Sequence, residues 1–108
     1  MIIISCIQLS KYNDLVICSL YKHYLEKIKN GSSKSDARWF GSSDDIQKTL
    51  LNNFSKDDVA FFCWELHSKG LLKCNPGDDI ANEGIIYMEN RFKNNFIELT
   101  DFISKFLP

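Results

Sequence analysis

Two residues that could do chemistry, Cys63 and His67, lie four positions apart in a segment with helical periodicity. This spacing puts both side chains on one helical face, where a thiol and its base, or two metal ligands, can meet. The chain holds only two histidines, however, and a structural zinc ion needs four ligands. His67 also stands near the predicted end of its helix, where the helix dipole stabilises an imidazolium. We therefore expect neither catalysis nor metal binding from this pair.

Aspartate pairs at residues 44–45, 57–58 and 78–79 are further candidates for acid–base chemistry. The first two stand where helices are predicted to begin and the third follows a predicted turn, so we interpret all three as solvated pairs with capping roles. The sequence contains no glycine-rich phosphate loop, serine nucleophile elbow or His-Glu-x-x-His motif. It predicts neither an enzyme nor a cofactor.

The cysteines are spaced by 12, 45 and 11 residues, so no two form a Cys-x-x-Cys clip of the zinc or redox kind. They are Cys6, Cys18, Cys63 and Cys74. Three of them sit inside apolar runs, and we expect reduced thiols, most of them packed as small hydrophobes, in a cytoplasmic protein.

Length and composition predict one globular domain over residues 1–108, with 44% apolar and 25% charged residues. Residues 1–7 are apolar, but no basic region precedes them, no small-residue cleavage pattern follows, and the run is too short to cross a membrane. We expect no export signal and no membrane association.

Capping residues and apolar spacing predict three helices before a hairpin. The first helix begins at Ser10–Asn13 and ends near Lys29, followed by a short strand at 37–40. Ser43 caps a short second helix. Ser55 and Asp58 form a capping box for the third, which Gly70 ends. Strand, turn and strand then follow at 71–74, 75–78 and 79–81.

The last segment has helical periodicity from Asn82 to Leu107, with continuity weakest at 93–95. Its apolar stripe comprises Ile85, Met88, Phe92, Phe96, Leu99, Ile103 and Phe106. Ile86 and Phe102 widen this stripe beyond what one helix-on-domain contact requires. The fold class is therefore mainly α with a small β-hairpin (α+β) and a long C-terminal helix.

This order of elements resembles the winged helix-turn-helix superfamily, especially small bacterial members of the MarR and PadR kind. The residues that carry the resemblance are 55–59 at the start of the third helix, 66–72 at its end, and 80–85 after the hairpin. The resemblance implies a winged-helix core at about 1–81 and a dimerisation helix at 82–108. Phe92, Phe96, Leu99, Ile103 and Phe106 would then form the main homodimer contact.

The resemblance also implies that the helix from Ser55 enters a DNA major groove while the hairpin at 74–80 touches the backbone. The candidate phosphate contacts are Lys34, Arg38, Lys56 and Lys73.

The outward face of the third helix departs from that pattern. Counted at 100° per residue, it presents Asp57, Phe61, Trp64 and Ser68. Residues 44–69 carry a net charge of −2, whereas residues 1–43 carry +3, so phosphate-neutralising charge lies mostly elsewhere. Phe61 and Trp64 have three open interpretations: burial under the C-terminal helix, a homodimer contact, or a surface for another partner.

Two functions follow as expectations. The first is a small winged-helix DNA-binding regulator or accessory factor, supported by the resemblance alone. The alternative is a winged-helix protein-interaction module that uses the aromatic face of the third helix. The partners expected are a second copy of the chain, double-stranded DNA, or another protein.

Overall fold

The computed structural model describes residues 9–74, 77–93 and 95–105, and this part of the chain is mainly helical with a small antiparallel sheet. In chain order the elements are α1 (Lys11–Lys29), α2 (Lys34–Ala37), β1 (Trp39–Gly41), α3 (Ser43–Thr49), α4 (Lys56–Ser68), β2 (Leu72–Lys73), β3 (Asp78–Ile80), α5 (Asn82–Phe92) and α6 (Phe96–Ser104). The expected class, mainly α with a small sheet, is confirmed.

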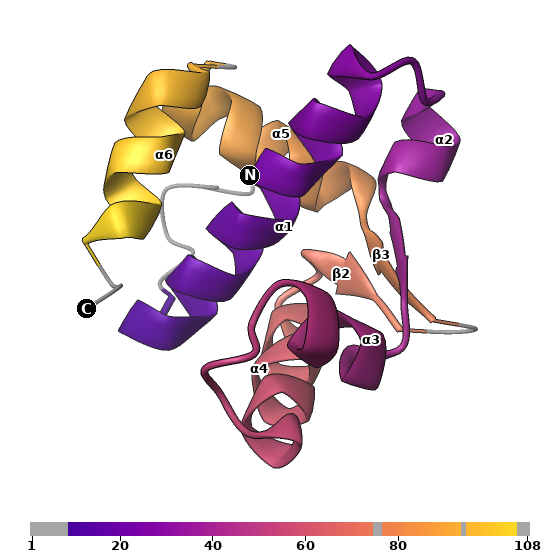
Figure 1. Cartoon of the computed structure of the whole chain (residues 1–108), viewed down its shortest axis with the longest axis vertical. Helices are drawn as coiled ribbons and strands as arrows, with labels where there is room; N and C mark the ends of the chain where they lie inside the picture. Colours follow the sequence, from indigo (N-terminus) through magenta and orange to yellow (C-terminus); the bar gives the residue numbers. More distant parts are fainter. Residues whose placement is uncertain (1–8, 75–76, 94, 106–108) are drawn as a thin grey trace, which may run out of the picture.

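Helix α1 is the central element. It begins as predicted, where the Ser10 hydroxyl accepts a hydrogen bond from the Asn13 backbone N–H at 3.3 Å. Figure 1 shows α4 below it and α5 and α6 above, and α1 contacts all three. Because its neighbours cover it on several sides, its buried residues come in an almost unbroken run from Leu15 to Tyr21.

The sheet has three strands in the order β1-β3-β2, with both pairs antiparallel. In the hairpin, Leu72 pairs with Ile80 and Lys73 with Asp79. Strand β1 was predicted at 37–40 but runs from Trp39 to Gly41, because Ala37 closes α2 instead. The predicted turn residues 75 and 76 lie outside the described part of the chain.

Helices α3 and α4 pack against each other and begin at serine caps. The cap of α3 is Ser42 and not Ser43 as predicted, since the Ser42 hydroxyl accepts from the Asp45 N–H while the Asp45 carboxylate accepts from the Ser42 N–H, each at 3.2 Å. Ser55 caps α4 by accepting from the Asp58 N–H at 3.1 Å. Gly70 follows α4 with φ of +79°, the stop that the sequence predicts.

The predicted continuous helix from Asn82 to Leu107 is wrong. Helix α5 ends at Phe92, Lys93 adopts the left-handed conformation with φ of 51°, and α6 starts anew after the Asn95 cap. Helix α6 turns back beside α1 (Figure 1), and this contact buries Leu99. The physical reason for the break is capping and packing: the Asn95 side chain accepts from the Glu98 N–H at 3.0 Å and starts a new helix, which packs on α1.

One hydrophobic core takes in side chains from all six helices and both hairpin strands. Cys18 and Cys63 are buried free thiols and Cys74 is a half-buried one, whereas Cys6 lies outside the described residues. Within the described ranges no helix is both long enough and apolar enough to cross a bilayer.

Candidate functional site

The outward face of α4 carries two large exposed aromatic side chains. Val59, Cys63 and Leu66 turn toward the core and are buried. On the opposite side Phe61 is 55% exposed and Trp64 is 62% exposed. The helical-wheel prediction of this face is therefore confirmed, and α6 does not cover it. Of the three interpretations, burial under the C-terminal helix is excluded.

An aromatic band continues from Phe61 to the start of α1. The band consists of Tyr12, Phe54, Phe61 and Phe62. Ring centroids are 6.4 Å apart between Phe61 and Phe62, and 5.9 Å from Phe62 to both Phe54 and Tyr12. These contacts hold the rings in edge and stacked arrangements, so one flank of the α4 face is preorganised.

A cleft of about 320 Å³ opens on the other flank, beside Trp64. It lies where α4 meets the beginning of α3 and the hairpin. Its lining residues are Ser42, Ser43, Ala60, Cys63, Trp64, Cys74, Gly77 and Asp78. We call it the Trp64 cleft.

Asp78 is the most buried polar group in this cleft, with 5% of the residue exposed. Burial raises the pKa of Asp78 above its usual range, and the nearby Cys74 thiol, which donates to the Cys63 carbonyl oxygen at 3.9 Å, lowers that pKa by less. The sequence analysis predicted that the acid pair Asp78–Asp79 is solvated, and this prediction is wrong for Asp78. It belongs to the central strand, where successive side chains point to opposite faces, so one acid of the pair turns inward.

The thiols of the cleft are poorly suited to nucleophilic chemistry. Burial, together with the nearby Asp78, raises the pKa of both Cys63 and Cys74 to about 12. The thiolate is the reactive form, and it is scarce at neutral pH when the pKa is this high. The cleft can instead offer a carboxylate acceptor, the Ser43 hydroxyl and an aromatic side chain to a ligand, whereas the Ser42 hydroxyl is held by Asp45.

Cys63 and His67, the pair with helical i,i+4 spacing, differ in their surroundings: Cys63 is buried and His67 contacts the hairpin. The Nδ1 atom of His67 lies 3.0 Å from the Leu72 carbonyl oxygen, so its ring is tied to the hairpin. Over residues 9–74, 77–93 and 95–105, no group of three or more Cys, His, Asp or Glu side chains could hold a metal ion.

The four predicted phosphate contacts fall into two groups. Lys56 at the start of α4 and Lys73 on β2 are exposed beside the α4 face. Lys34 begins α2, which packs against α1. Arg38 follows α2 and donates from Nη1 to the Asn82 Oδ1 at 2.6 Å, so it holds the start of α5.

The side chains of the last segment that were predicted to form the homodimer contact also differ in exposure. Phe92 and Leu99 are buried in the core of their own chain, and Ile103 is half-buried against it. Phe96 is partly exposed, and Phe106 lies outside the described residues. The most exposed large apolar side chain of α6 is Ile97, which is 74% exposed and which the periodicity did not single out.

A second cavity of about 370 Å³ lies between α1 and β1. Its cation, Lys27, donates from Nζ to the Trp39 carbonyl oxygen at 2.7 Å and lies 4.2 Å from the centroid of the Phe40 ring. Burial lowers the pKa of this ammonium group. These two contacts join α1 to β1, and they account for the position of the Lys27 side chain.

Comparison of the chain with known protein families, curated proteins and solved structures found no match.

Proposed function

We propose that this chain is a winged-helix domain that binds another protein through the α4 face. The element order supports the winged-helix assignment: α3 and α4 form a packed helix pair, a hairpin follows, and β1 adds to the hairpin as a third strand. In such folds the second helix of the pair and the hairpin form one binding surface. Here that surface comprises α4, β2 and β3.

The observation that carries the protein-binding proposal is the exposure of Phe61 and Trp64. Aromatic side chains at the centre of a surface, surrounded by polar groups, are typical of the residues that dominate protein interfaces. Asp57, Lys56 and Ser68 surround them on α4, and all three are exposed. The preorganised aromatic band further reduces the entropy that binding would cost.

DNA binding by a small regulator is the second candidate. The exposed Lys56 and Lys73 favour it, because they stand at the start of α4 and on the hairpin, where phosphates would lie. The acidic side chains of the first turn of α4, Asp57 and Asp58, oppose it. We rank DNA second for this reason.

A retardation assay with pooled genomic fragments at about 50 and 200 mM salt separates the two functions. The protein-binding proposal expects no shift at either concentration. DNA binding would instead be established by a shift that weakens steeply with salt and that Lys56→Glu with Lys73→Glu removes. The control Lys105→Glu, which follows the end of α6, should leave such a shift in place.

Homodimerisation remains part of the proposal, but through a different surface from the buried stripe. Ile86 on α5 and Phe96 and Ile97 on α6 are exposed apolar side chains that a second copy could cover. Light scattering at tens of micromolar should give twice the monomer mass for the intact chain, and the monomer mass for Ile97→Asp. We place this activity in the cytoplasm, consistent with free thiols at Cys18, Cys63 and Cys74.

Peptide display on the immobilised chain tests protein binding directly. Selected peptides should lose binding to Phe61→Ser and Trp64→Ser variants and retain it on Ile97→Ser. The control removes an even more exposed apolar side chain from a remote helix. If no selected peptide depends on Phe61 or Trp64, the α4 face is not the binding surface.

A further inference from the structure

The Asp78 carboxylate lines the Trp64 cleft and has no lysine or arginine partner among the described residues. Among the described residues, the groups that favour its charged form are the Cys74 thiol and the His67 imidazole. A buried carboxylate usually has a cationic partner, since desolvating an unpaired charge is costly.

The wall of the cleft adds a surface that suits a cation. The Trp64 side chain lines the opening and is largely exposed. Indole is the ring that attracts cations most strongly through its face. A ligand in the cleft would therefore meet both a negative charge and an aromatic ring.

The surrounding surface is negative as well. Residues 42–80, which form α3, α4 and the hairpin, hold seven acidic and four basic side chains, a net charge of −3, whereas the whole chain carries −1. Asp44 and Asp57 are exposed in the first turns of α3 and α4. This field attracts a basic partner and repels an acidic one.

The size and chemistry of the cleft favour one side chain in particular. A volume of about 320 Å³ is at the lower limit for ligand pockets and can hold one long side chain. Arginine combines a planar group that stacks on aromatic rings with a donor fork that matches a carboxylate. Lysine offers the charge without the planar stacking.

We propose that the Trp64 cleft binds an arginine side chain from a basic segment of a partner protein. The guanidinium donates to the Asp78 carboxylate and stacks on the Trp64 indole, while apolar residues of the same segment cover Phe61. The inference rests on the proposed protein-binding function and specifies the chemistry of the partner.

The test uses the intact chain and peptides selected on it by display. The selected peptides should share an arginine next to apolar residues. One of them is then resynthesised with citrulline, which keeps the shape of arginine but is neutral, and both forms are titrated by fluorescence anisotropy. We expect the citrulline form to bind at least about tenfold more weakly.

A double-mutant cycle locates the contact. In Asp78→Asn the difference between the arginine and citrulline peptides should vanish, whereas in Asp79→Asn it should persist. The control removes the same charge from the neighbouring residue, which does not line the cleft. Trp64→Ala provides a second variant, since this exposed residue can change without disturbing the core, and it should weaken the arginine peptide more than the citrulline peptide.

The outcomes distinguish this inference from the proposed function. Peptides that depend on Phe61 and Trp64 but carry no arginine would overturn the inference and leave the protein-binding function standing. An arginine preference that Asp78→Asn leaves intact, or that Asp79→Asn abolishes equally, would also overturn it. If no peptide depends on the α4 face, both proposals fail.

Discussion

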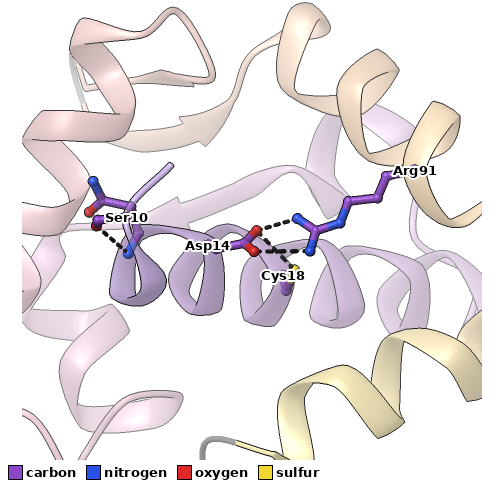
Figure 2. A network of polar contacts seen from close by, with 5 residues as sticks. Ser10, Asp14, Cys18 and Arg91 are labelled. Carbon is purple, nitrogen blue, oxygen red and sulfur yellow. Dashed lines mark hydrogen bonds and ion pairs between the residues drawn. The ribbon is translucent and has the colours of Figure 1, made fainter. Parts of the chain in front are cut away.

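The guanidinium of Arg91 on α5 lies against the carboxylate of Asp14 on α1, joining two helices across 77 positions of the sequence. Nη1 donates to Oδ1, and Nη2 donates to Oδ2 at 2.9 Å. Figure 2 shows this bidentate pair with the Cys18 thiol on the same carboxylate. The Arg91 guanidinium also lies 4.6 Å from the centroid of the Phe102 ring, so one side chain connects α1, α5 and α6.

Replacing Arg91 with Met should lower the free energy of unfolding by about 2 kcal/mol. Breaking an exposed pair costs under about 1 kcal/mol and breaking a buried one about 3 to 5 kcal/mol. Here the side chains are 28% and 18% exposed, which is intermediate. Urea denaturation measures the change, with Lys105→Met as the control, since this exposed lysine follows the end of α6. Equal midpoints for the Arg91 variant and the wild type would show that the pair adds nothing.

Local signals in the sequence predicted several boundaries correctly. Ser10 and Ser55 cap helices because a side-chain oxygen needs only the N–H groups of the next turn. Gly70 ends α4 because its conformation is accessible to glycine at low cost. Helical spacing alone placed Phe61 and Trp64 on the face of α4 opposite the core, but it left open whether another helix covers them.

The features that sequence reasoning missed depend on non-local packing. Two asparagines mark 93–95 as the weakest point of the last helix, and the break falls there, but the apolar spacing continues through it, so the sequence did not show that α6 turns back onto α1. The Trp64 cleft likewise requires the hairpin to lie next to the start of α3, which no local pattern encodes. Strand alternation could have shown that one residue of the 78–79 acid pair faces inward.

Asp78→Asn should stabilise the chain at neutral pH. Burial raises the folded-state pKa of Asp78, so the ionised carboxylate opposes folding at every pH above its unfolded pKa of about 3.9. The neighbouring Cys74 thiol and His67 imidazole oppose this shift but do not cancel it. The contribution of Asp78 to the free energy of unfolding of the wild type therefore falls as pH rises from its unfolded pKa through its higher folded pKa.

Thermal unfolding of Asp78→Asn and wild type at pH 7 and at pH 3.5 measures this effect. The variant should melt at a higher temperature than the wild type at pH 7. This difference in melting temperature should shrink at pH 3.5, where Asp78 of the wild type is protonated. A variant that is less stable than wild type at pH 7 would contradict the assigned burial cost. Together with lost binding of arginine peptides, a gain in stability would identify Asp78 as a residue that costs stability for function.

Gly84→Ala should destabilise the fold although alanine is the better helix former. A Cβ at this position in α5 would meet the Leu71 carbonyl oxygen at 2.4 Å and the Ile80 side chain at 3.0 Å. Relieving this overlap would shift α5 away from the hairpin and cost about 1 to 3 kcal/mol. Urea denaturation measures the loss of stability. The control is Asn90→Ala at an exposed position of the same helix, which should be neutral or slightly stabilising. If Gly84→Ala is also stabilising, α5 does not approach the hairpin this closely.

Lys93→Gly distinguishes the broken C-terminal segment from the continuous helix that the periodicity predicts. Lys93 has φ of 51° and ψ of 41°, a conformation that costs a residue with a Cβ about 1 to 2 kcal/mol and glycine much less. After the greater freedom of glycine in the unfolded chain is deducted, the variant should be more stable by about 0.5 to 1 kcal/mol. Lys93→Ala keeps the Cβ and should leave the stability nearly unchanged. In a continuous helix the order would reverse, since an interior glycine costs about 1 kcal/mol relative to alanine. Urea denaturation of the three proteins gives the order directly, and a glycine variant less stable than the alanine variant would restore the single long helix.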